Sequence, residues 1–142
     1  MGVDQERVVL EFLRCAEGRT QDVEAMTARM TEDIVWRVNV PLSKVVQGRD
    51  AARAEIERQN TVSTGMLEGS EVVTIASNDN VVFTERVDVV ELAGKQMTFR
   101  INGIFEVRDG QIAAWREYFD TCDMVQQLGM PLGFDPNRLY QT

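Results

Sequence analysis

The sequence contains no histidine in 142 residues, and this absence removes several classes of enzyme. Ser-His-Asp triads, HExxH zinc sites and imidazole proton shuttles all need that side chain. Only two cysteines occur, Cys15 and Cys122, which are too few for a disulfide framework and too far apart in sequence for a zinc site. We therefore expect two buried free thiols.

Long apolar runs are also missing, so no segment approaches the length of a membrane span. The first residues, Met1-Gly2-Val3-Asp4, follow no signal peptide, and the low cysteine content is typical of a reducing compartment, so the sequence predicts a cytoplasmic protein. The formal net charge of -8 argues against nucleic acid and anionic membranes, because their phosphates would be repelled. A neutral or apolar small molecule is the expected ligand.

The three prolines are isolated, and the sequence has no internal repeat and no Pro/Gly/Ser-rich linker. A chain of this length with 44% hydrophobic residues can fill one core. We therefore predict a single domain over residues 1–142.

Periodicity predicts helices first and strands afterwards. The expected N-terminal elements are a helix over residues 4–17, a helix capped by Thr20 and reaching residue 30, a strand over residues 34–40, and a helix with Asp50 as its N-cap. The expected C-terminal elements are strands over residues 68–76, 81–92, 96–107 and 111–119 and a short helix over residues 120–128. Short turns demand antiparallel neighbours, so this order predicts an α+β fold with a curved antiparallel sheet wrapped around N-terminal helices, a cone with a pocket inside.

Charged residues inside one apolar strand are the most informative feature of the sequence. Arg86 and Asp88 are two residues apart and therefore share a face of that strand. Asp120, at the end of another apolar segment, is the expected second partner of Arg86. Two carboxylates around one guanidinium allow one acid to stay protonated while the other stays ionised, which permits acid and base chemistry without histidine.

Five stretches carry a resemblance to a known family, in order and at compatible spacings: Asn39-Val40-Pro41-Leu42, Gly48-Arg49-Asp50-Ala51, Thr84-Glu85-Arg86-Val87-Asp88-Val89, Gly103-Ile104-Phe105-Glu106-Val107, and Asp109-Gly110-Gln111-Ile112 running into Trp115-Arg116-Glu117-Tyr118-Phe119-Asp120. Over roughly residues 5–125 the chain closely resembles the limonene epoxide hydrolase family. The resemblance implies the cone-shaped roll of nuclear transport factor 2-like (cystatin-like) proteins. It also implies a homodimer that uses no metal or organic cofactor.

The resemblance also implies roles for individual residues. The aspartate matching Asp120 would be the general base that removes a proton from water, and the one matching Asp88 would protonate the departing epoxide oxygen. The arginine matching Arg86 would bridge the two. An asparagine matching Asn39 would hold the water with a tyrosine two residues earlier, but this chain has Arg37 there.

Each of these residues also has a structural explanation. Arg86 and Asp88 could form a stabilising ion pair, and Asp120 precedes a predicted helix that it could cap. Arg37 could pair with a surface carboxylate or, since alternation puts it on the face of Asn39, point into the pocket.

The sequence favours a cofactor-independent epoxide hydrolase that adds water to a small, largely apolar epoxide. Two alternatives stay open at this point: an epoxide-opening cyclase that uses a substrate hydroxyl, and a non-catalytic binding domain for an apolar ligand. Arg116 and Glu117 are predicted to lie on a solvated face of the sheet.

Overall fold

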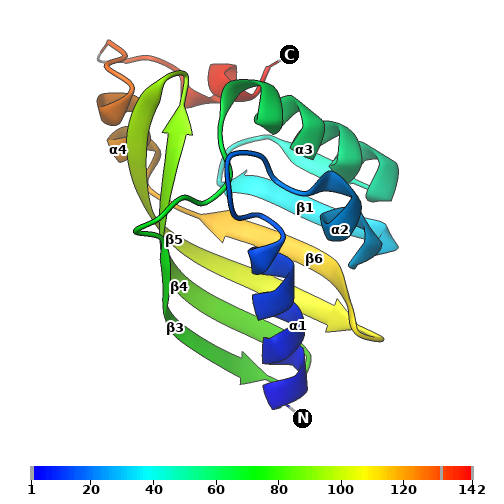
Figure 1. Ribbon diagram of the computed structural model, residues 1–142. Helices are drawn as coiled ribbons and strands as arrows, with labels where there is room; N and C mark the ends of the chain where they lie inside the picture. Colours follow the sequence, from blue (N-terminus) through cyan, green and yellow to red (C-terminus); the bar gives the residue numbers. More distant parts are fainter. Residues whose placement is uncertain (1, 132, 142) are drawn as a thin grey trace.

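The computed structural model describes residues 2–131 and 133–141 and is built on one curved six-stranded sheet with helices packed against it (Figure 1). The strand order is β2-β1-β6-β5-β4-β3. The elements are α1 (Gly2–Arg14), α2 (Val23–Ala28), β1 (Met30–Val40), β2 (Val45–Gln47), α3 (Arg49–Val62), β3 (Glu71–Asn78), β4 (Val81–Leu92), β5 (Lys95–Arg108), β6 (Gln111–Tyr118), α4 (Thr121–Gln127) and the 3-10 helix η1 (Pro136–Tyr140). The α+β prediction is confirmed.

Strands β3 to β6 form the expected antiparallel meander. Strand β1 pairs with β6 in parallel, with Trp36 opposite Trp115, so the sheet is mixed at this one pair. Parallel neighbours cannot be joined by a tight turn, and here α3 and four strands separate them in sequence. The short strand β2, which was not predicted, pairs antiparallel with the outer edge of β1.

The helices cover the concave side of the sheet, with α1 lying across β3 to β6, α3 lying over β1 and β2, and α2 packed against α3 (Figure 1). The core between them is rich in aromatic rings. Trp36 and Trp115 stack with their ring centroids 4.3 Å apart, and Phe12 of α1 meets Trp115 edge-on at 5.1 Å. Such offset and edge-to-face pairs add to the free energy gained from burying the rings.

Two predicted helix caps are wrong. Helix α2 is capped by Asp22, whose carboxylate accepts a hydrogen bond from Ala25 N at 3.1 Å, and not by Thr20. Helix α3 begins after Gly48, whose φ of 90° suits glycine, and Asp50 lies inside the first turn. An acidic side chain there still interacts favourably with the positive end of the helix dipole.

Helix α4 and the C-terminal segment close one end of the cone (Figure 1). Gln127 ties α4 to β5, because its side-chain oxygen accepts from Thr98 N at 2.9 Å and its side-chain nitrogen donates to Thr98 O at 2.8 Å. Cys122, in the first turn of α4, is exposed and Cys15 is half-buried, so the prediction of two buried thiols is wrong. Throughout the described ranges, every helix is too short or too polar to cross a lipid bilayer.

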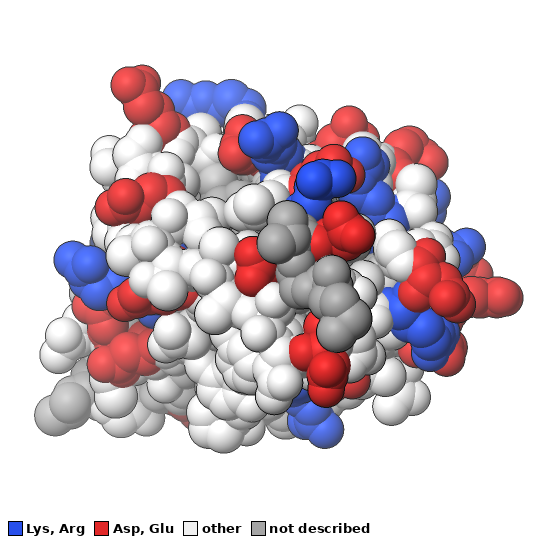
Figure 2. Space-filling view, turned by 90° about the horizontal axis from the view of Figure 1, so that it is seen from below, with Lys and Arg blue, Asp and Glu red and all other residues white. Residues whose placement is uncertain are grey.

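Charged side chains of both signs are interspersed with uncharged surface on the face shown in Figure 2. Ion pairs between exposed groups, such as Arg19 with Glu91 and Arg108 with Asp33, contribute little to stability because water screens them. One cluster of charges is buried instead, and it lies on the concave face of the sheet.

Candidate active site

A cavity of about 440 Å³ is lined by residues of α4, the β4–β5 turn, the end of α3 and the C-terminal segment, among others. Figure 1 shows these four parts of the chain at one end of the sheet. Its volume falls within the range of small-molecule sites. Most of its wall is apolar, with contributions from Val90, Phe99, Phe119, Met124 and Leu128. Charged groups enter the cavity from the sheet, where Arg86, Asp88 and Glu117 line it.

Arg86 binds two carboxylates at once. Its Nε and Nη2 donate to the carboxylate oxygens of Asp88 at 3.2 and 3.0 Å, and its Nη2 and Nη1 donate to those of Glu117 at 2.7 and 3.2 Å. A further bond runs from Nη1 to Thr84 Oγ1 at 3.1 Å. The guanidinium is 2% exposed, Asp88 8% and Glu117 7%, so this is a buried cluster of three charged side chains. We call these three residues the carboxylate–arginine cluster.

The cluster is possible because the strand between its members, β5, has a glycine at this point. Gly103 of β5 lies between Thr84 of β4 and Glu117 of β6 in the ladder. A Cβ at this glycine would lie 2.5 Å from Arg86 Nη1 and 2.6 Å from Glu117 Oε2. Arg86 can therefore reach over β5 to a carboxylate two strands away because position 103 has no side chain.

Burial and the mutual interactions of the cluster shift the pKa values of Glu117 and Arg86. Burial raises the pKa of the Glu117 carboxyl above its ordinary value, and nearby Asp88 adds to this, although Arg86 acts in the opposite direction. Burial alone would lower the pKa of Arg86, but the two carboxylates outweigh it and raise that pKa, so the guanidinium stays charged. With one proton shared by the two carboxyls the cluster carries no net charge, which an apolar pocket tolerates best.

Asp120, the predicted second partner of Arg86, lies elsewhere. Its Oδ1 accepts hydrogen bonds from Cys122 N at 2.9 Å and Asp123 N at 3.2 Å, which makes it the N-cap of α4. The expectation that Asp120 contacts Arg86 is wrong. Its oxygen instead satisfies amides that the start of a helix leaves without partners.

Glu117 takes the predicted place of Asp120 beside Arg86. Its assignment to a solvated face was wrong, since the side chain is buried and bonded to the guanidinium. Strand alternation could have found it: Glu117 is two residues after the core residue Trp115 and shares its face, whereas Asp120 is five residues after it. Two adjacent charged residues, Arg116 and Glu117, led instead to the prediction of a solvated face.

The two residues predicted to hold water are not on one face. Arg37 is exposed, whereas Asn39 is wholly buried. The register of β1 against β6 shifts between Arg37 and Val40, so that Val38 and Asn39 together stand opposite Glu117. This extra residue is a β-bulge, which breaks the alternation on which the prediction for Arg37 rested.

Sequence reasoning missed Tyr140, which lines the same cavity from η1. Its hydroxyl accepts a hydrogen bond from Asn39 Nδ2 at 3.2 Å. These two residues are far apart in the chain, and no local pattern indicates that they meet.

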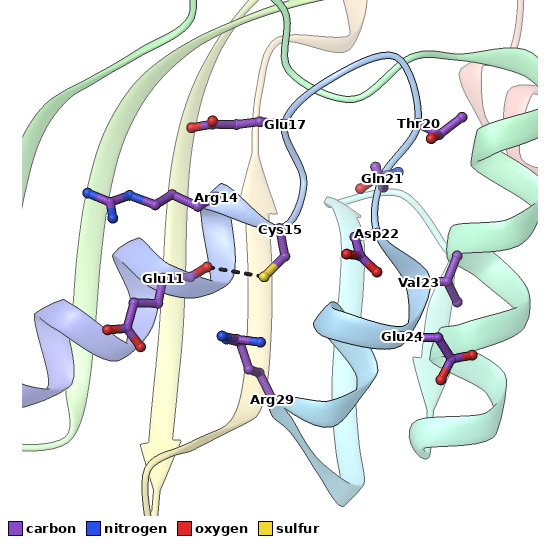
Figure 3. A pocket seen from close by; sticks show the side chains of 10 residues that line it. All are labelled: Glu11, Arg14, Cys15, Glu17, Thr20, Gln21, Asp22, Val23, Glu24 and Arg29. Atoms are coloured by element: carbon purple, nitrogen blue, oxygen red, sulfur yellow. Dashed lines mark hydrogen bonds between the residues drawn. The ribbon is translucent and has the colours of Figure 1, made fainter.

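A second, shallower hollow of about 820 Å³ lies between α1 and α2 (Figure 3). Its lining is mostly charged or polar, and Cys15 Sγ there donates to Glu11 O at 3.3 Å. None of its ten side chains has a buried polar atom without a partner. Within the described residues, no three His, Cys, Asp or Glu side chains group as metal ligands.

Comparisons with known proteins agree with this architecture. The family model described as limonene-1,2-epoxide hydrolase catalytic domain matches residues 3–129. The chain is 31% identical over 110 residues to epoxide hydrolase EphG of Mycobacterium tuberculosis (strain ATCC 25618 / H37Rv), covering 78% of this chain and 70% of that protein.

Solved structures show the same likeness. A limonene epoxide hydrolase-like epoxide hydrolase from M. tuberculosis matches with a TM-score of 0.76 and 28% identity over 89% of this chain and 90% of the other. A hypothetical protein with a ketosteroid isomerase-like fold from Catenulispora acidiphila DSM 44928, in complex with trimethylamine, matches with a TM-score of 0.76 and 14% identity over 91% and 97% of the two chains. The second likeness concerns the fold alone.

Proposed function

This chain belongs to the limonene-1,2-epoxide hydrolase family, and we propose that it adds water to a small, largely apolar epoxide to give a vicinal diol. The observation that carries the proposal is the carboxylate–arginine cluster, Asp88–Arg86–Glu117, in the wall of an otherwise mainly apolar cavity. Such a site combines room for a hydrocarbon ring with two acids held in fixed positions.

Opening an epoxide with water needs an acid and a base together. Water is a weak nucleophile at neutral pH and an alkoxide is a poor leaving group, so both proton transfers must accompany the displacement. Two carboxyls that share one proton can supply both functions. The fixed charge of Arg86 favours one ionised carboxyl beside the protonated one. Burial raises the pKa of Glu117 and so favours the proton on that group before substrate binds, and our proposal therefore requires the proton to move to Asp88, along the contacts of Arg86, before water attacks.

In our proposal Glu117 is the base and Asp88 the acid. Glu117 lies on β6, next to β1 and opposite the bulge at Asn39, the residue predicted to help hold the water. The Glu117 carboxylate removes a proton as the water oxygen bonds to an epoxide carbon. The C–O bond breaks, and the departing oxygen takes the proton of Asp88.

Turnover leaves the proton on the wrong carboxyl, since Glu117 has gained one and Asp88 has lost one. Arg86 contacts both groups through several N–H donors, and this continuous hydrogen-bond connection supports return of the proton to Asp88. The two acids would titrate as one coupled pair.

The test is a panel of terpene, cyclic and styrene-type epoxides incubated with purified protein, with products identified by mass spectrometry. A diol supports the proposal. A cyclic ether formed from an epoxide that carries a hydroxyl would support the cyclase alternative, and binding without turnover of any panel member would support a non-catalytic binding domain.

Three other expectations stay predictions: a homodimer, a cytoplasmic location and no binding to nucleic acid. Light scattering during gel filtration measures the first. The expected result is a mass of two chains at micromolar concentration.

A further inference from the structure

The C-terminal segment is fastened next to the candidate active site, beyond residues 3–129 that the family model matches. Asp135 caps η1 by accepting from Asn137 N at 3.0 Å. Asn137 Oδ1 in turn accepts from the backbone nitrogen and the hydroxyl of Ser43, at 2.9 and 2.8 Å. These bonds hold η1 against the β1–β2 connection and bring Tyr140, its last residue, over β1.

Tyr140 presents a hydroxyl to the cavity. The oxygen accepts from Asn39 Nδ2 at 3.2 Å, and the O–H proton has no acceptor among the described residues. Burial raises the pKa of this hydroxyl to about 12, although the bond from Asn39 acts to lower it. At neutral pH Tyr140 therefore keeps its proton and can donate it to a group in the cavity.

The side chain of Asn39 has a buried oxygen that is available to a water molecule. Its side chain is 0% exposed, and its Oδ1 has no hydrogen-bond partner among the described residues. A buried acceptor without a partner destabilises the fold, so a water that donates a hydrogen bond to this oxygen would be held there. The β-bulge sets Asn39 opposite Glu117, on the strand next to the proposed base.

We propose that Tyr140 and Asn39 hold the attacking water, so that the C-terminal segment supplies the tyrosine hydroxyl that position 37 lacks. The water would donate one proton to Glu117 and one to Asn39 Oδ1 and accept a bond from Tyr140. Its second lone pair would then be directed to the epoxide carbon. This inference rests on the proposed function.

The kinetic test removes one hydroxyl and keeps the ring. Tyr140→Phe should lower kcat and kcat/KM for 1-methylcyclohexene oxide by the same factor, about 10-fold or more, because the interaction orients the nucleophile. Tyr118→Phe is the matched control, since Tyr118 is the other of the two tyrosines and is exposed on β6. It should behave as the wild type, and equal thermal midpoints of the two variants would confirm intact folding.

A second readout separates orientation of water from packing. In water labelled with ¹⁸O, the share of label at each of the two epoxide carbons should change in Tyr140→Phe and stay unchanged in Tyr118→Phe. Adding Arg37→Tyr to Tyr140→Phe should restore neither rate nor label position, because Arg37 is exposed. Unchanged kinetics and label position in Tyr140→Phe, with Glu117→Gln inactive, would overturn the role of Tyr140 and leave the proposed function standing.

A crystal structure provides a readout that does not depend on turnover. The wild type and Tyr118→Phe should each show an ordered water bonded to Tyr140 Oη, Asn39 Oδ1 and the Glu117 carboxylate, and Tyr140→Phe should lose it. No water bonded to these three groups in the wild type would overturn the inference, including in the case that no epoxide of the panel is hydrolysed.

Discussion

Glu117 and Asp120 lie only three residues apart, but their carboxylates have different hydrogen-bond partners, because strand β6 ends between them. Glu117, on β6, accepts two hydrogen bonds from Arg86, whereas Asp120, after the end of β6, accepts two from backbone amides of α4. One carboxylate is thus buried in the carboxylate–arginine cluster, and the other is used to begin a helix. For this reason the proposed function assigns the base to Glu117 and not to Asp120.

Exchange of each carboxylate for its amide tests that distinction. Glu117→Gln should lower kcat/KM by at least about 10²-fold, because it removes the proposed base. Asp120→Asn is the matched control, since asparagine caps helices as well as aspartate does, and it should keep near-full activity. Steady-state kinetics on any epoxide that the wild type hydrolyses would measure both, and an inactive Asp120→Asn with an active Glu117→Gln would reverse our assignment.

The planar shape of the Arg86 side chain should matter as well as its charge. Arg86→Lys should lower kcat by about 10²-fold, because one ammonium group cannot bridge two carboxylates as a guanidinium fork does and both acids would shift. The control is Arg100→Lys, which changes an exposed arginine of β5. Activity of Arg86→Lys equal to that of the control would show that a point charge is sufficient.

Position 103 should tolerate no side chain. The added methyl group of Gly103→Ala would lie too close to Arg86 and Glu117, so that the cluster must separate and its charges lose partners. We expect a loss of about 1–3 kcal/mol in the free energy of unfolding together with a large drop in activity. Asn102→Ala, at the exposed neighbouring position, should change neither quantity in urea titration and kinetic assays.

The dependence of activity on pH should reveal the ionisation of Glu117. Burial raises the pKa of this carboxyl above its ordinary value of 4.5, and the proposed base must be ionised to work. The plot of kcat/KM against pH should therefore decline, as pH falls, through a pKa above 4.5. A decline centred at or below the ordinary value would contradict the assignment of Glu117 as the base.

The same shift has a consequence for stability. Because the folded protein binds the proton of Glu117 more tightly than the unfolded chain does, this group stabilises the fold at low pH, and the effect is lost as pH rises through the raised pKa. The difference in unfolding free energy between wild type and Glu117→Gln should thus become less favourable to the wild type across that window. Denaturant titrations at a series of pH values measure it.

If water attacks the epoxide directly, ¹⁸O from labelled water should enter the product and not the enzyme. The chain has no histidine that could activate water to hydrolyse an aspartyl or glutamyl ester, so we expect no covalent intermediate. In a single turnover in ¹⁸O-labelled water, the label should appear in the diol and in neither Asp88 nor Glu117. Peptide mass spectrometry that finds label in either carboxyl would establish a covalent route instead.

The sequence by itself determined the α+β class, the strand meander and the pairing of Arg86 with Asp88. Each of these follows from local information, since residues two apart on a strand share a face and short turns force antiparallel neighbours. The resemblance to limonene epoxide hydrolases likewise needed only residue types in order, and the family comparison confirms it.

The tertiary structure decided which groups complete the site. Glu117 meets Arg86 only because strand register sets Gly103 between them, and Asn39 turns inward only because a bulge in β1 breaks the alternation. Tyr140 arrives from the far end of the chain through bonds that fasten η1 to Ser43. Contacts of this kind depend on how separate segments align in space. The hydrophobic periodicity of a single segment does not predict its register against another segment.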